Sequence, residues 1–126
     1  MNDMDLEQII TIVHDWAKSE PNIRTAYIFG SRVRGNYTTK SDVDIAVEIY
    51  QDKHDVDITL TWGDIHPVLS DRLSSLLPYT VQLELYEESI TNTIRKALRE
   101  GSILAYDDKH DIPVSQNSAA QKGGQP

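Results

Sequence analysis

The stretch Phe29-Gly-Ser-Arg-Val-Arg-Gly-Asn-Tyr-Thr-Thr-Lys-Ser-Asp-Val-Asp-Ile45 joins two segments that have the patterns of β-strands. The first segment, Arg24–Phe29, is a β-branched and aromatic run that stops at Gly30. The second, Asp42–Ile49, alternates acidic or small residues with aliphatic ones, as a strand with one buried face does. A polar segment that contains Gly35 separates the two. The sequence therefore predicts a strand, a tight turn, a loop and a second strand.

The turn after the first strand has the residues of a phosphate-binding loop. Gly30 lets backbone N–H groups approach a phosphate without a Cβ in the way, and Ser31 offers a hydroxyl. A helical turn after them would aim its N-terminus at the anion. No Gly-Lys-Ser/Thr follows the glycines, which excludes a Walker A loop. The pattern Gly-Ser-x-x-x-Gly is also a common turn composition, so it indicates phosphate only together with other evidence.

That evidence is an acidic pair at the start of the second strand. Ten residues separate Ser31 from Asp42, and Asp42 and Asp44 stand two apart, so both carboxylates point to the same face of the strand. Oxygen ligands on one face suit Mg²⁺, which also binds substrate phosphate oxygens. The second such pair, Asp55 and Asp57, lies in a charged segment with no glycine-rich turn before it. We expect that pair to be part of a solvated loop.

The distribution of charge favours the same interpretation. The chain of 126 residues has 12 Lys and Arg against 20 Asp and Glu, a net charge of −8. Residues 21–41 have no acid, and they contain Arg24, Arg32, Arg34 and Lys40. This local excess of four positive charges is the patch that a polyphosphate needs. Arg32, Arg34 and Lys40 are therefore candidate phosphate-binding residues.

The rest of the chain predicts a single small domain. Aliphatic periodicity and capping residues predict a helix over Asp5–Lys18, a helix within Leu60–Leu77, a strand over Thr80–Tyr86, a helix that begins after Ser89 or Thr91 and ends at Gly101, and an edge strand over Ser102–Tyr106. We expect residues 1–106 to form the domain. Residues 107–126 have few apolar side chains, and we expect a disordered polar tail there.

Composition excludes several classes of protein. The absence of Cys removes disulfides, thiolate nucleophiles and Cys-based zinc sites. No apolar run approaches the roughly 18 residues of a membrane span, and the negative net charge disfavours nonspecific binding to nucleic acid or anionic lipid. Nothing at the N-terminus has the pattern of a signal peptide. We expect a cytoplasmic protein with neither nucleic acid nor membrane as a partner.

Gly30, Ser31, Gly35, Asp42 and Asp44, set on this order of strands, resemble the nucleotidyltransferase fold of the DNA polymerase β superfamily, in particular its one-domain minimal nucleotidyltransferases. The resemblance covers residues 24–106 and implies an α/β (α+β) domain with a mixed sheet flanked by helices. It implies that Gly-Ser holds the triphosphate of ATP and that the two Asp residues hold two Mg²⁺ ions. Members are commonly antitoxins encoded beside a HEPN ribonuclease, and some transfer AMP to a tyrosine of that toxin. The implied partner is such a toxin, in a hetero-oligomer.

The sequence departs from the family at the third acid. Alignment of Pro78–Leu85 with the corresponding strand puts Gln82 where the acid belongs, and Gln neither accepts a proton nor adds charge to a metal site. Glu84 lies two residues further along the same face, roughly 7 Å away by strand rise. Two interpretations stay open: Glu84 completes the catalytic set with Asp42 and Asp44, or the protein has weak or no activity and neutralises its partner by contact. Transfer to a small molecule such as an aminoglycoside is a third alternative.

Overall fold

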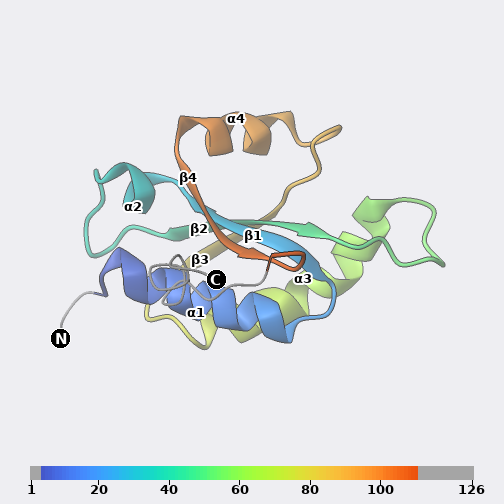
Figure 1. Cartoon of the computed structure of the whole chain (residues 1–126), viewed down its shortest axis with the longest axis horizontal. Helices are drawn as coiled ribbons and strands as arrows, with labels where there is room; N and C mark the ends of the chain where they lie inside the picture. Colours follow the sequence, from blue (N-terminus) through green and yellow to red (C-terminus); the bar gives the residue numbers. More distant parts are fainter. Residues whose placement is uncertain (1–3, 111–126) are drawn as a thin grey trace, which may run out of the picture.

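The computed structural model describes residues 4–110, which form four helices and four strands. In chain order the elements are α1 (Leu6–Ser19), β1 (Ile23–Phe29), α2 (Ser31–Arg34), β2 (Val43–Ile49), α3 (Ile58–Ser74), β3 (Val81–Leu85), α4 (Asn92–Glu100) and β4 (Ser102–Asp107). The strands make one sheet in the order β3-β2-β1-β4. α1 and α3 lie on one side of this sheet, and α2 and α4 lie on the other (Figure 1). The predicted fold class, a small α/β (α+β) domain with a mixed sheet flanked by helices, is confirmed.

The register of the sheet determines which side chains share a row. β1 is antiparallel to both β2 and β4, whereas β2 and β3 are parallel and are joined through α3. Phe29 pairs with Asp44, and Asp44 pairs with Gln82. Two rows further along, on the same face of the sheet, Ala46 pairs with Glu84. The predicted acid positions on β2 and β3 therefore lie at the same end of the sheet, where β1 ends and β2 begins.

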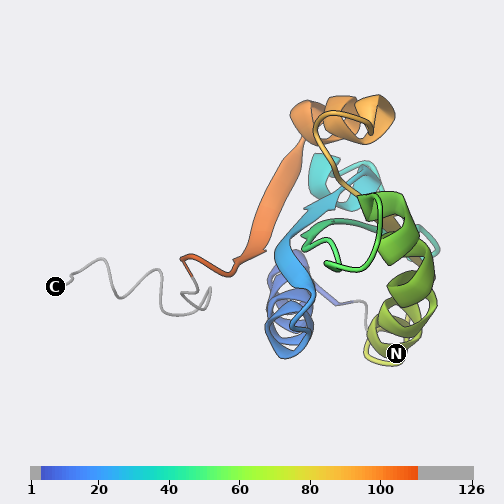
Figure 2. The ribbon, with the colours of Figure 1, turned by 90° about the vertical axis from the view of Figure 1, so that its right-hand side faces the viewer.

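The main core lies between the sheet and the two helices α1 and α3 (Figure 2). A capping box starts α1: Asp5 accepts a hydrogen bond from the Gln8 backbone N–H, and the Gln8 side chain accepts one from the Asp5 N–H. Trp16 of α1 is buried in this core, as its helical position predicts. The largest fully buried side chains here are Ile9, Val13, Ile23, Ile28, Val43, Ile45, Val47, Leu69 and Leu73.

The opposite face of the sheet is only partly covered. Leu98 of α4 packs on Phe29 and Ala46 in a second, smaller cluster. Because Val43, Ile45 and Val47 face the main core, the alternate residues of β2 point to this second face, as predicted from the sequence. Asp44 is one of those residues. Partial cover by α4 therefore leaves the acidic end of β2 on a surface that a ligand can reach.

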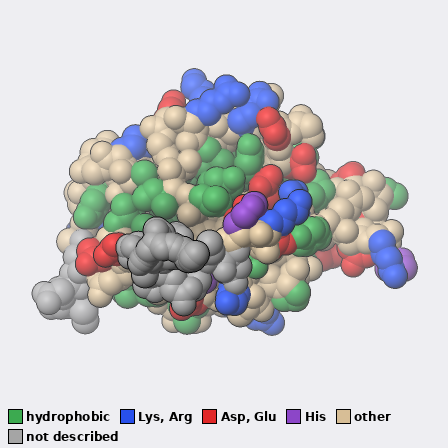
Figure 3. All heavy atoms as spheres, viewed as in Figure 1, with side chains coloured by type: hydrophobic (Ala, Val, Ile, Leu, Met, Phe, Trp, Pro, Cys, Tyr) green, Lys and Arg blue, Asp and Glu red, His purple; other side chains and the backbone are tan. Residues whose placement is uncertain are grey.

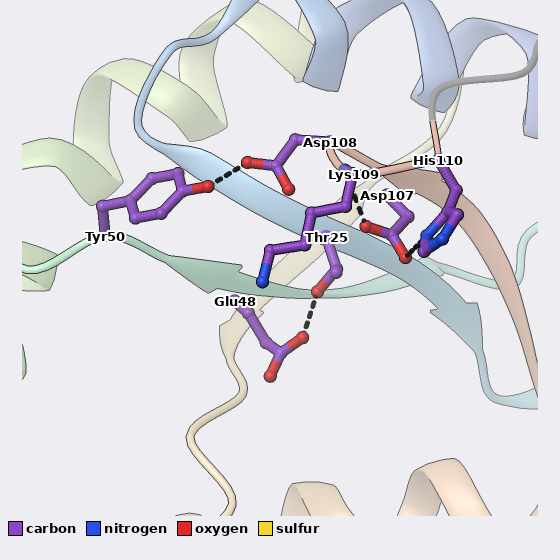
Figure 4. Close-up of polar contacts among 7 residues, drawn as sticks. All are labelled: Thr25, Glu48, Tyr50, Asp107, Asp108, Lys109 and His110. Carbon is purple, nitrogen blue, oxygen red and sulfur yellow. Dashed lines mark hydrogen bonds and ion pairs between the residues drawn. The ribbon is translucent and has the colours of Figure 1, made fainter.

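Two boundaries differ from the sequence prediction. α3 begins at Ile58, before the predicted segment Leu60–Leu77, because Asp57 caps it, and it ends at Ser74, within that segment. β4 extends to Asp107, and the backbone N–H of Asp108 donates to the Arg24 carbonyl, so residues 107–110 belong to the fold. Figure 4 shows the side-chain contacts of this segment, in which the Tyr50 hydroxyl donates to Asp108. The remaining part of the expected tail, residues 111–126, lies outside the described residues.

Candidate active site

The predicted phosphate turn and the acidic strand meet at Gly30 and Asp44. Gly30 has φ of 84°, which side-chain-bearing residues rarely adopt. A Cβ at this position would lie 2.9 Å from the carboxyl carbon of Asp44 and closer still to a carboxylate oxygen. The Asp44 carboxylate therefore fills the space that any side chain at position 30 would need. Glycine is required here by the approach of Asp44 as well as by any approach of phosphate.

The predicted helical turn after Gly30 is present as α2. Its first residue is Ser31, and the Gly30 carbonyl accepts hydrogen bonds from the backbone N–H groups of Val33 and Arg34. Gly35 ends the helix in the left-handed conformation, with its N–H donating to the Ser31 carbonyl. The strand, the glycine turn, the helical turn and the acidic strand thus follow one another as the sequence predicts.

The carboxylates at this end of the sheet repel one another. Asp44 is half-buried, and its pKa lies above the ordinary value of 3.8, first because of burial and then because of the negative charges of Asp42 and Glu84. The positive charge of Arg34 acts in the opposite direction. Asp42, Asp44, Glu84 and Arg34 therefore lie close enough to affect one ionisation. A carboxyl group whose pKa is raised by burial and by neighbouring acids is typical of a functional site.

Gln82 takes part in this group as a hydrogen-bond donor. It pairs with Asp44 across the two strands, and its side-chain Nε2 donates to Asp42 Oδ2 at 3.3 Å. Glu84 lies two residues further along β3, opposite Ala46, and is exposed to solvent. The residue beside Asp44 on β3 is thus an amide that donates to Asp42, and Glu84 is the next carboxylate along β3.

The three candidate phosphate-binding cations have different surroundings. Arg34 lies near Asp44, and Lys40 is exposed in the loop between Gly35 and Asp42. Arg32 is only 3% exposed, and its guanidinium donates to the Ser41 carbonyl at 2.9 and 3.2 Å. The structure therefore brings Arg34 to the acids, whereas Arg32 points into the protein.

Arg32 connects the phosphate turn to the loop that carries Asp42. Its guanidinium lies over the rings of Tyr37 and Tyr79, at 5.0 and 4.0 Å from their centroids. Its backbone follows Ser31, and its hydrogen bonds hold Ser41, the residue before Asp42. The arginine therefore fixes the position of Asp42 relative to the turn. This role was not predicted, because the pairing of Arg32 with Tyr79 depends on residues that are far apart in the sequence.

The residues at this end of the sheet fit a magnesium ion whose coordination the substrate completes. Within residues 4–110 no three His, Cys, Asp or Glu side chains lie close enough together to hold a metal by themselves. Proteins usually bind Mg²⁺ through one or two carboxylates, with waters and substrate phosphates as the other ligands. Asp42 and Asp44 supply that number, and the raised pKa of Asp44 marks a place where a cation would relieve repulsion.

The other acidic pair is satisfied by its own helix. Asp57 caps α3 and accepts hydrogen bonds from the backbone N–H groups of Thr59 and Leu60, at 2.9 and 3.3 Å. Asp55 accepts a hydrogen bond of 2.6 Å from the Thr61 hydroxyl. Both residues precede α3, in the loop where the sequence predicts them, and their contacts with the first turn of that helix give them a local structural role.

Comparison with known proteins agrees with this arrangement. Residues 7–110 match the family model described as polymerase beta, nucleotidyltransferase. The chain belongs to this nucleotidyltransferase family. Membership supports a transferase activity of the kind the family has, with a nucleotide substrate and a divalent metal as is typical of the superfamily. No curated protein matches the sequence.

Solved structures of toxin–antitoxin systems have the same fold. One, a toxin–antitoxin with AMP-PNP, is 24% identical over 93% of this chain and 88% of that chain, with a TM-score of 0.52. A mutant of the toxin–antitoxin MntA-HpeT is 21% identical over 94% and 89%, with a TM-score of 0.52. A second mutant of that system is 24% identical over 95% and 89%, with a TM-score of 0.51. At these identities the likeness establishes the fold.

Proposed function

We propose that this nucleotidyltransferase is Mg²⁺-dependent, moves AMP from ATP to a tyrosine hydroxyl of a HEPN-type toxin, and so acts as an antitoxin. The observation that carries the proposal is the contact between the Gly-Ser turn and the acidic pair, in which Asp44 lies against Gly30. The match to the nucleotidyltransferase family supports the reaction class, and the likeness to toxin–antitoxin structures, one of them with AMP-PNP, supports the partner and the nucleotide.

Each of the groups at this site has a separate role in binding ATP or Mg²⁺ under this proposal. The backbone at Gly30 and the hydroxyl of Ser31 bind the phosphates beyond the reacting one, and Arg34 and Lys40 offset their charge. Arg32 keeps the loop before Asp42 in place through the Ser41 carbonyl. Asp42 and Asp44 would hold Mg²⁺, which when bound supplies positive charge to the phosphate oxygens.

The reaction itself is an in-line displacement. The phenolic oxygen of the acceptor forms a bond to the α-phosphorus of ATP, the bond between the α-phosphorus and the bridging oxygen breaks, and pyrophosphate leaves. The phenolic proton must go to a base. Gln82 cannot accept this proton, because its amide is not basic and already donates a hydrogen bond to Asp42. We therefore assign the role of base to Glu84, whose negative charge contributes to the raised pKa of Asp44.

One observation favours a second candidate function. Gln82, and not an acid, pairs with Asp44 across the two strands, and this favours a protein that inhibits its toxin by contact, with weak or no transfer. Transfer to a small molecule has no comparable observation in its favour.

Within residues 4–110 there is no helix long and apolar enough to span a membrane. Both of the favoured candidates need a protein partner, and we place the interaction in the cytoplasm.

The test distinguishes transfer from contact. A HEPN-type protein is sought in the reading frames beside that of this chain. The two proteins are purified together and incubated with Mg²⁺ and ATP labelled at either the α- or the γ-phosphate. We expect label on the partner from α-labelled ATP only, and none with the Asp42→Asn, Asp44→Asn double variant. A complex that binds ATP but leaves the partner unlabelled would overturn transfer and support inhibition by contact.

A further inference from the structure

A second concave surface lies at the opposite end of the sheet from the candidate active site. β2 and β3 are parallel, so the segments that follow them, residues 50–57 and 86–91, meet at the far end. The length of β2 places this end about 20 Å from the acidic pair. A groove of about 480 Å³ lies between the two segments. This end groove is lined by Gln51, Asp57, Ile58, Thr59, Glu87, Ser89 and Ile90.

Exposed aliphatic side chains gather at the end groove. Ile90 lines it and is 53% exposed, while Val56 and Leu60, which flank its lining residues in the sequence, are 84% and 51% exposed. Single exposed aliphatic residues are common on protein surfaces. The aliphatic residues that line the end groove are Ile58 and Ile90, and Val56 and Leu60 each lie next to a lining residue in the chain. A groove with exposed aliphatic side chains is typical of a site of protein interaction. Ile58 packs partly against the main core and so anchors the floor of the groove.

The rim of the end groove is strongly acidic and well ordered. The two segments carry five acids against a single Lys or Arg, Lys53: Asp52, Asp55, Asp57, Glu87 and Glu88. Figure 3 shows acidic side chains gathered at this end, on the right of the view. Hydrogen bonds fix Asp55 and Asp57 to the first turn of α3, and the Glu87 backbone carbonyl accepts from the Thr91 hydroxyl. Of these five acids, Asp57 and Glu87 line the end groove, whereas Glu88 lines a neighbouring pocket with Arg95 and Arg99. The side chains that line the end groove therefore include two acids and no Lys or Arg.

We propose that the end groove docks a segment of a partner protein that carries aliphatic side chains flanked by Lys or Arg. The acidic rim disfavours nucleic acid and anionic lipid, and it also disfavours a second copy of this chain, since two such rims repel each other. The inference extends the proposed function, because it assigns the grip on a partner to a surface remote from the nucleotide. Docking at the groove leaves the candidate active site open.

The experiment uses a defined probe of this chemistry. A fluorescein-labelled amphipathic helical peptide of Leu and Lys is titrated with the full chain, beside a scrambled peptide of the same composition that has no apolar face. We expect the amphipathic peptide to bind more tightly than the scrambled one. The variant Leu60→Ser, Ile90→Ser should weaken its binding by about tenfold, because it removes the exposed aliphatic side chain of Ile90, which lines the groove, and that of Leu60, the residue after the lining residue Thr59.

A matched variant controls for the general effect of removing exposed aliphatic side chains. Val68 and Leu76 are 47% and 49% exposed and do not line the end groove, so Val68→Ser, Leu76→Ser should leave the affinity within about twofold of wild type. Equal binding of the two peptides, or equal loss in the two double variants, would overturn the proposal. So would concentration-dependent dimerisation that the Leu60→Ser, Ile90→Ser variant abolishes, because it would identify a second copy as the occupant.

A parallel measurement separates this inference from the proposed function. Binding of ATP with Mg²⁺ is measured on the same three proteins, and we expect it to be unchanged by either double variant. If the wild type failed to bind ATP with Mg²⁺, the proposed function would fail while the result for the groove stood. If ATP bound and the peptide failed to distinguish the variants, only the groove would be rejected.

Discussion

The pairs Asp42-x-Asp44 and Asp55-x-Asp57 have the same sequence pattern and different surroundings. Asp44 lies against Gly30 at the start of β2, and its pKa is raised by burial and by neighbouring acids. Asp57 caps α3, and its pKa is lowered because its carboxylate accepts hydrogen bonds from the Thr59 hydroxyl and from backbone N–H groups. In the first pair, Asp44 is repelled by the negative charges of neighbouring acids. In the second pair, Asp57 is stabilised by hydrogen bonds from the first turn of α3. An acidic pair is a candidate for metal binding when the fold leaves it unsatisfied.

The largest effect should come from neutralising the first pair. We expect Asp42→Asn, Asp44→Asn to lower AMP transfer by about a thousandfold or more, because a bound metal supplies several kcal/mol of charge stabilisation. Isothermal titration with ATP, with and without Mg²⁺, checks whether binding is lost as well. The matched variant Asp55→Asn, Asp57→Asn should keep Mg²⁺-dependent binding. Equal losses in the two variants would remove the distinction between the pairs.

A second prediction asks which further carboxylate belongs with the first pair. If Glu84 accepts the proton, Glu84→Gln should lower the rate of transfer by about 10² to 10⁴, and Gln82→Asp should change it little. The measurement is initial rate with labelled ATP. A rise in rate for Gln82→Asp, together with no change for Glu84→Gln, would contradict the assignment and identify the wild type as a weakened enzyme.

Alanine at two glycines tests the contact between the phosphate turn and Asp44. Gly30 and Gly35 both have positive φ, at 84° and 88°, so alanine costs about 1 to 3 kcal/mol of stability at either position. Only at Gly30 does the new Cβ collide with Asp44, whereas at Gly35 nothing lies within 4 Å. We expect Gly30→Ala to lose more stability and most ATP binding, measured by thermal denaturation and titration. If Gly35→Ala impaired ATP binding as much, the Gly30 contact would not be what matters.

The smallest expected effect is a change in thermal stability. Replacing one acid should raise Tm in the first pair and lower it in the second. The raised pKa of Asp44 means that folding disfavours its ionised form, a penalty present above its ordinary value of 3.8 and lost as the pH falls below it. Asp44→Asn should therefore raise Tm near neutral pH without Mg²⁺, and the gain should vanish in acid. Asp57→Ala should lower Tm near neutral pH, because the lowered pKa of Asp57 marks a stabilising carboxylate. A fall in Tm for both variants would refute the contrast.

Much of this site follows from local sequence, and the remainder depends on long-range packing. The alternation in β2 and the glycine turn predict the acidic face and α2 because both are properties of neighbouring residues. The burial of Arg32 could not be predicted, since it depends on Tyr79, which lies 47 positions later in the chain. The position of Gln82 beside Asp44 likewise depends on the register of a parallel pair joined through α3.

α3 starts before the segment that its aliphatic pattern predicts, because its N-cap residue is polar. The aliphatic pattern placed the helix within Leu60–Leu77, whereas Asp57 begins it through hydrogen bonds to Thr59 and Leu60. Asp is a favoured N-cap residue, so the second acidic pair contained the boundary signal. The same contacts explain why that pair is unavailable to a metal.

The most direct test of the proposed active site is to locate where a divalent cation binds to the protein. Mn²⁺ is added in place of Mg²⁺ to the isotopically labelled chain with ATP, and the broadening of backbone amide signals in NMR spectra is mapped onto the structure. We expect strong broadening at Gly30, Ser31, Asp44 and Gln82, with the signals of Asp55 and Asp57 unaffected. Broadening centred on Asp55 and Asp57, or spread evenly over the acidic surface, would contradict the claim that the Gly-Ser turn and the first acidic pair form the active site.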